Sequence, residues 1–174
     1  SDGTRQGTKL VYDAIPGPQG LFENIYAPPD SIVKAIGNKV FFKTFNNLQT
    51  GPLSSVQLYV TDGTTAGTTQ VTSIGLLAQT NEVFTEVNGK LMFSKFEAEH
   101  GFELWKSDGT KAGTTIVGDI TGNSTSGSPW SVAFAAKSIF VISRYGTNAG
   151  VISPEGSLYS IPFADSPPPA PSAK

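Results

Sequence analysis

The sequence predicts an all-β fold in which a four-stranded antiparallel unit is repeated about three times along the chain. Three observations lead to this prediction: a recurring turn motif, an apolar hairpin pattern that recurs with it, and a composition typical of strands and turns. Only 15% of the 174 residues are charged, and the chain contains 19 glycines and 12 prolines. An average globular domain has roughly 25% charged residues.

The recurring turn has the pattern S/T-D-G-T-x-x-G-T. It reads SDGTRQGT, TDGTTAGT and SDGTKAGT at residues 1–8, 61–68 and 107–114. The strand-like runs LYV and LWK precede the second and third copies, and TKLVYDAI, TTQVTSI and TTIVGDI follow the three copies in order. Each copy therefore predicts a connection between two antiparallel strands.

The residues of this DGT turn have a clear structural use. An aspartate can accept hydrogen bonds from backbone amides two residues on, and the following glycine can take the positive φ of a tight turn. Carboxylates at regular spacing also occur in calcium-binding repeats, but each copy offers one carboxylate where calcium takes about six to eight oxygens. The sequence favours a structural turn shared by all copies, without a cofactor. The turn residues are Asp2, Gly3, Asp62, Gly63, Asp108 and Gly109.

An apolar strand, a short turn and a second apolar strand recur in each unit, at residues 31–45, 82–96 and 130–144. The NG pair in the second copy is a strong hairpin signal, because both central positions of a type I′ turn require positive φ. The GN pair of the first copy fits the same position, and the AK pair of the third fits it less well. Consecutive apolar residues in the second strands indicate that both faces of each sheet are covered, as in blades packed face to face.

These patterns together predict a β-propeller-like repeat domain over residues 1–163, built from four-stranded antiparallel blades. The turns at positions 62 and 108 are separated by roughly the 40 to 50 residues of one propeller blade. The predicted blades cover about residues 31–75, 82–120 and 130–163, and the proline-rich ending at 164–174 predicts a tail or linker.

The last unit has no DGT turn and no fourth strand, whereas the chain opens with a turn and a spare strand, TKLVYDAI. We therefore expect residues 1–15 to complete the last blade by pairing with SLYSIPF at 157–163, either within the chain or with a neighbouring chain. Three blades are fewer than the usual four to eight of a propeller ring. The partners implied are other blades of the same longer polypeptide or copies of the chain itself.

The run FELWKSDGTKAGTTIVGDI at residues 102–120 resembles the repeat of the ELWxxDGT family, a group of large secreted or surface bacterial proteins. The resemblance is weaker at QLYVTDGTTAGT, residues 57–68, and the final unit GSLYSIPF keeps only the LY pair. It implies a propeller-like architecture and an extracellular or cell-surface location. It carries no catalytic residues.

The sequence predicts that the chain is not an enzyme. His100 is the only histidine, lies at a predicted hairpin tip, and has no G-x-S-x-G nucleophile nearby, so we expect a solvated loop histidine. Glycoside hydrolysis requires two carboxylates about 5 to 9 Å apart. Four acidic residues crowd this region without a spacing that demands such a pair, and a polar turn is the favoured interpretation. They are Glu97, Glu99, Glu103 and Asp108.

Candidate ligand-binding residues are the aromatics at equivalent strand positions, Tyr59, Trp105 and Tyr159, which could stack on sugars or pack between blades. Asn123 lies in an N-x-S/T sequon, a possible glycosylation site. The absence of cysteine excludes thiolate metal sites. Twelve basic against fourteen acidic residues, without a basic cluster, disfavour nucleic acid, and no apolar run is long enough for membrane insertion.

The leading prediction is a non-catalytic extracellular or cell-surface module with a structural or adhesive role, as in a segment of an adhesin, fibre or matrix protein. The alternative is a carbohydrate-binding, lectin-like β-propeller whose partners are glycans.

Overall fold

A computed structural model describes residues 3–13, 32–46, 55–76, 83–120, 127–143 and 156–163. Within these ranges the chain forms eleven β-strands and no helix. The described residues therefore contain no helix that is long and apolar enough to cross a membrane. The predicted all-β class is confirmed. Asp2, Asn123 and the tail at 164–174 lie outside the described residues.

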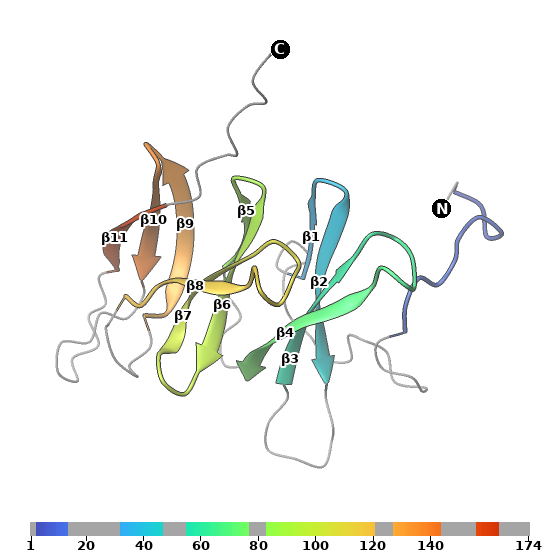
Figure 1. Ribbon diagram of the computed structural model, residues 1–174, viewed down its shortest axis with the longest axis horizontal. Coiled ribbons are helices and arrows are strands. Elements are labelled where there is room, and N and C mark those ends of the chain that lie inside the picture. The colour runs from blue at the N-terminus through green and yellow to red at the C-terminus, as the bar shows by residue number, and fades with distance from the viewer. Residues whose placement is uncertain are drawn as a thin grey trace.

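The strands form three antiparallel sheets, which lie side by side in a row (Figure 1). The first sheet contains β1 (Val33–Ile36), β2 (Lys39–Asn46), β3 (Ser55–Thr61) and β4 (Thr69–Leu76), and the second contains β5 (Phe84–Val87), β6 (Lys90–Glu97), β7 (Gly101–Ser107) and β8 (Thr115–Gly118). The third contains β9 (Pro129–Ala135), β10 (Ser138–Ser143) and β11 (Ser157–Pro162). The strands of each sheet follow one another in chain order, and no sheet is closed, so a propeller ring is not established.

The three DGT turns share one backbone conformation, as predicted. Gly3, Gly63 and Gly109 have φ values of 85°, 93° and 93°. Positive φ is accessible to glycine without steric cost, because it has no Cβ. The repeat assignment made from the sequence is therefore confirmed at the level of backbone geometry.

The tight hairpins differ in how well their residues suit the turn. Asn88 and Gly89 between β5 and β6 have φ values of 51° and 76°, the pattern of a type I′ turn. Ala136 and Lys137 between β9 and β10 take the same conformation, with φ values of 50° and 64°. Neither alanine nor lysine favours positive φ, so this turn carries backbone strain.

The strand registers show that the units are equivalent residue by residue. The aromatic residue of the third strand lies opposite the central residue of the second strand in every sheet. The pairs are Phe42 with Tyr59, Phe93 with Trp105, and Val141 with Tyr159. The alignment of the LY and LW runs predicted from the sequence is therefore correct.

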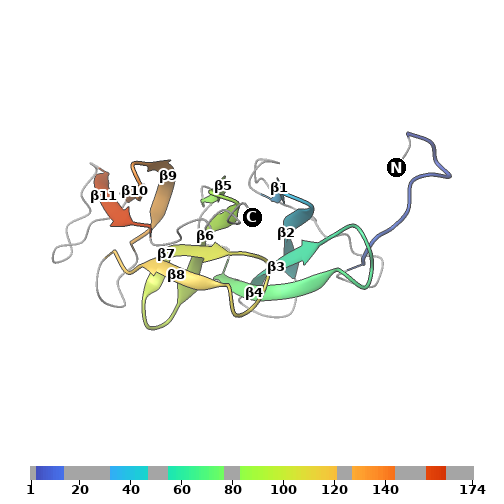
Figure 2. The same cartoon turned by 45° about the horizontal axis from the view of Figure 1, so that its top comes forward.

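Each sheet has two faces, which we call A and B. The letters are defined on the second sheet and applied to the equivalent positions of the other two. Face A of the second sheet carries Leu91 and Phe93 and packs on the first sheet, and its face B carries Met92 and Leu104 and packs on the third. Figure 2 shows the second sheet between the other two. Both faces of this sheet are covered, as the run of consecutive apolar residues in its second strand predicts.

Two apolar cores fill these junctions. The first core contains Ile36, Phe41, Val56, Leu58, Val60, Val71 and Ile74 of the first sheet with Phe84, Leu91 and Phe93 of the second. The second core contains Val83, Val87, Met92 and Leu104 of the second sheet with Ile139, Val141 and Phe163 at the third. By register, both junctions join face B of one sheet to face A of the next.

The N-terminal segment does not pair with the last strand inside this chain. Residues 8–13 form no strand, and the only described neighbour of β11 is β10. The segment lies on the first sheet instead, where the Oγ1 atom of Thr65 donates to the carbonyl oxygen of Val11 at 2.8 Å. Because the sheets form a row, the first sheet and β11 lie at opposite ends of it (Figure 1), so the expected pairing within the chain is wrong.

Candidate functional site

Glu103 is an acidic side chain on β7 that has no exposed surface. The strand begins after a tight turn at residues 97–101, where the His100 amide donates to the Glu97 carbonyl oxygen at 3.3 Å. Neighbours in the strand alternate between the two sheet faces. Glu103 therefore points away from Leu104, which belongs to the second core.

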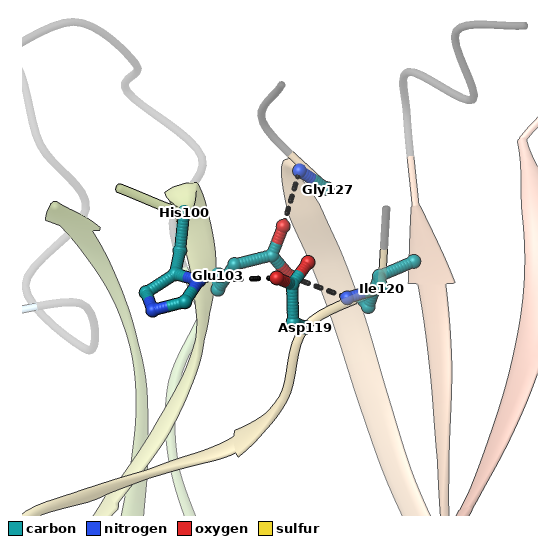
Figure 3. A network of polar contacts seen from close by, with 5 residues as sticks. All are labelled: His100, Glu103, Asp119, Ile120 and Gly127. Atoms are coloured by element: carbon teal, nitrogen blue, oxygen red, sulfur yellow. Dashed lines mark hydrogen bonds and ion pairs between the residues drawn. The ribbon is translucent and has the colours of Figure 1, made fainter. Parts of the chain in front are cut away.

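Both carboxylate oxygens of Glu103 accept hydrogen bonds from backbone amides (Figure 3). The Ile120 amide donates to Oε2 at 3.0 Å, and the Gly127 amide donates to Oε1 at 2.7 Å. These two residues flank the segment that links the second sheet to the third. A Cβ atom at Gly127 would stand 2.6 Å from Oε1, so only glycine allows this approach. One buried side chain thus holds both ends of the linker.

A hydrogen bond between two side chains lies beside this carboxylate. The Nδ1 atom of His100 is 3.0 Å from Oδ2 of Asp119, which follows β8. Figure 3 shows the imidazole of His100 directed at the Asp119 carboxylate, next to Glu103. His100 lies in the turn before β7, as expected from the sequence, and its side chain is 37% exposed while it contacts Asp119.

Burial raises the pKa of Glu103 to about 7 from 4.5, because the ionised form loses its hydration. The amides of Ile120 and Gly127 favour the ionised form and lower the pKa in part, the nearby Asp119 charge raises it, and His100 lowers it. A raised carboxyl pKa is common at catalytic sites. Here, however, both oxygens are already occupied by the protein's own backbone, so the arrangement serves as a clamp.

The other acidic residues singled out from the sequence do not join Glu103 in one site. Glu97 pairs with Lys95, Glu99 is exposed, and Asp108 lies beyond the far end of β7 in a DGT turn. Asp119 was missed, since only the return of the chain after β8 brings it near His100. Among the described residues there is no group of three or more histidine, cysteine, aspartate or glutamate side chains that could hold a metal ion.

The DGT aspartates are engaged within their own turns. The Oδ1 atom of Asp62 accepts from the Thr64 amide at 2.9 Å, and that of Asp108 accepts from the Thr110 amide at 2.8 Å. Hydrogen bonds from the Thr64 hydroxyl and amide lower the pKa of Asp62. At Asp108 burial raises the pKa, but the bonds from Thr110 and the charge of Lys39 outweigh it and lower it overall. Each aspartate therefore stabilises its own turn through these hydrogen bonds.

The three candidate aromatic residues do not converge on one surface. Trp105 packs against the first core, and the Lys95 ammonium stands 3.9 Å from its ring centroid. Tyr159 packs against the second core. Tyr59 alone lies on an outward face, stacked on Phe42 at a centroid distance of 5.5 Å. Each ring keeps the equivalent place in its own sheet, as the sequence predicts.

No protein-family model, curated protein or solved structure matches this chain, so the resemblance to ELWxxDGT repeats stays a prediction from its sequence.

Proposed function

We propose that this chain is a non-catalytic structural or adhesive module of an extracellular or cell-surface protein, in which its sheets serve as blades of a longer propeller-like array. The observation that carries this proposal is the repeated junction: face B of one sheet packs on face A of the next at both places where sheets meet. A unit that stacks in the same way each time suits a role in which extent and rigidity matter more than a single site.

The environment of the acidic residues supports the non-catalytic part of this proposal. Glu103 combines a raised pKa with burial, but its oxygens bind the amides of Ile120 and Gly127. A general acid must reach the proton acceptor of a substrate within hydrogen-bonding distance. A carboxylate without exposed surface, already bonded twice to the backbone, lacks that access.

Surface labelling tests the proposed location. An antibody against the folded chain should label intact cells that produce the protein, and protease added to intact cells should remove the signal. A cytosolic protein serves as the control that must stay protected. Labelling only after permeabilisation would contradict the proposal, as would turnover in a broad hydrolase screen that Glu103→Gln abolishes.

Carbohydrate binding remains a second candidate because of one aromatic group. The rings of Tyr12 and Phe42 lie 5.6 Å and 5.5 Å from Tyr59 and form an aromatic surface on face A of the first sheet. Aromatic faces of this kind stack on sugar rings. Binding on a glycan array that Tyr59→Ala abolishes and Phe134→Ala leaves intact would support this role, and an array without signal would remove it.

A further inference from the structure

The two ends of the row of sheets expose the same two faces that are buried inside it. Leu58 and Leu104, at equivalent positions on face B of the first and second sheets, have no exposed surface. Their counterpart Leu158 on face B of the third sheet is 67% exposed, and its cross-strand partner Ile142 is 43% exposed. The apolar surface that the next described sheet covers on the first and second sheets is therefore exposed on the third.

The first sheet offers the complementary surface. Its face A carries Phe42 and Tyr59, at the positions that Phe93 and Trp105 hold at the first junction. It also carries the turn at Gly63. A Cβ atom at Gly109, in the equivalent turn of the second sheet, would stand 3.2 Å from Val60 of the first sheet, whereas one at Gly63 would meet nothing within 4 Å. The first sheet thus presents an equivalent docking turn, in which Gly63 meets no other sheet and Thr65 contacts Val11 of the N-terminal segment.

A free sheet edge accompanies the open face. The first and second sheets each have a fourth strand after the DGT turn, β4 and β8, but β11 has no described neighbour on its outer side. The N-terminal DGT turn is already formed: the Gly7 amide donates to Oγ1 of Thr4 at 2.9 Å, as the Gly67 amide does to Thr64. The residues after it form no strand, and Leu10 is 80% exposed.

We propose that a second copy of this chain binds here head to tail. Residues 8–13 of the second copy add a fourth strand to the outer edge of β11, and its first sheet packs face A against face B of the third sheet. The proposal deepens the proposed function and rests on it, since it names the partner of the structural module. A head-to-tail contact that does not close on itself continues into an open array.

One copy can make both contacts together because of the chain order. In the first unit β4 is followed by β5, which is the first strand of the second sheet. The second sheet packs on face B of the first sheet, to which β4 belongs. Residues 8–13 precede β1 in the same order. Once residues 8–13 pair with β11 of another copy, the first sheet can pack on face B of that copy's third sheet. The second sheet packs on face B of the first sheet in the same way.

The two complete sheets also fix the register of the proposed pairing. Tyr59 lies opposite Gln70, and Trp105 lies opposite Ile116. Counted from the DGT turn, Gln70 and Ile116 correspond to Leu10, and the opposite aromatic residue corresponds to Tyr159. Leu10 of one copy should therefore lie opposite Tyr159 of the next, where the Cα atoms of paired strands are about 4.5 to 5.5 Å apart. That separation is suitable for a disulfide bond.

The chain has no cysteine, which makes a crosslinking test clean. The double variant Leu10→Cys/Tyr159→Cys, oxidised under native conditions, should give a ladder of dimers, trimers and larger species on a non-reducing gel. The variant Leu10→Cys alone can form dimers at most. A control pair, Leu10→Cys/Trp130→Cys, places the second thiol on β9, at the other edge of the third sheet, and should give no ladder.

Solution mass gives an independent readout. The mass of the unmodified chain by sedimentation should rise with concentration, and Leu158→Asp should keep it near the 18.3 kDa of one chain. Because Leu158 is exposed, this variant should retain its strand circular dichroism. Ala98→Asp, at the exposed turn between β6 and β7, adds the same charge and should assemble normally.

Three results would overturn the proposal: a single-chain mass at every concentration, a disulfide formed only within one chain, or equal ladders from both cysteine pairs. The outcome is separate from that of the proposed function. If the pure chain assembles but intact cells are not labelled, the proposed cell-surface location is contradicted. If intact cells are labelled but the chain stays monomeric, the proposed head-to-tail contact is contradicted.

Discussion

Gly109 lies against Val60 across the first junction, and a Cβ atom added to Gly109 would stand 3.2 Å from Cγ2 of Val60. The backbone oxygen of Asp108 accepts a hydrogen bond from the Lys39 ammonium at 2.9 Å in the same contact. The DGT turn of the second sheet is therefore also a docking element, which anchors one sheet to the sheet before it.

Gly63 and Gly109 have the same φ, so the effect of the docking contact on stability can be separated from that of backbone strain. Gly109→Ala and Gly63→Ala both place a side chain at φ 93°, but only the first also meets Val60 and Phe41. We expect Gly109→Ala to lower the free energy of unfolding by about 1 to 3 kcal/mol more than Gly63→Ala, the range typical of overpacking. Urea denaturation of the two variants measures the difference, and equal losses would show that the contact is unimportant.

Phe163 takes the place of this turn at the second junction. It is buried, its ring lies 5.2 Å from the Lys106 ammonium, and it packs edge-on against Phe134. Phe163→Ala should cost about 3 kcal/mol, since it leaves a cavity between the second and third sheets. Thermal unfolding gives the measurement. Phe134→Ala, at a position that is 42% exposed, is the control and should cost much less.

The Glu103 clamp predicts a specific pH dependence. The pKa of Glu103 is about 7 in the folded chain and 4.5 as the ordinary value, so between these limits the folded state binds more protons than the unfolded state. This group's contribution to the free energy of unfolding is therefore fully present below pH 4.5 and lost as the pH rises through 7.

Glu103→Gln removes this titration but keeps the shape of the side chain. At pH 5 we expect it to be about 1 kcal/mol less stable than the natural chain, because its side-chain nitrogen cannot accept from a backbone amide, whereas the hydroxyl oxygen of the protonated carboxyl can. The difference should shrink or reverse by pH 8. Urea titrations across this range test the prediction, and Glu99→Gln, at an exposed position, should run parallel to the natural chain.

The strained hairpin between β9 and β10 predicts a stabilising change. Ala136 and Lys137 have φ values of 50° and 64° in the conformation that Asn88 and Gly89 occupy in the second sheet. Replacing them with Asn and Gly should raise the stability of the third sheet by about 1 kcal/mol, since these residues suit a type I′ turn. Thermal unfolding should show the gain, and Asn88→Ala/Gly89→Lys should show the matching loss. A hairpin indifferent to both changes would contradict the assignment of strain.

The sequence by itself determined the local features of this protein. Asp and Gly at fixed positions between apolar runs specify the DGT turns, and their shared positive φ follows from chemistry within a few residues, as Gly3, Gly63 and Gly109 show. The strands and their registers follow for the same reason, because hairpins bring neighbours in sequence together.

The tertiary structure alone decided which faces and which distant groups meet. From the sequence, Glu103 is one of several acidic residues in a predicted polar turn. In the structure, the chain beyond β8 brings the amides of Ile120 and Gly127 to its carboxylate oxygens. The row of sheets likewise placed residues 8–13 on the first sheet, far from β11, against the pairing expected within the chain. Contacts of this kind depend on how whole sheets pack, and neither periodicity nor turn chemistry encodes that arrangement locally.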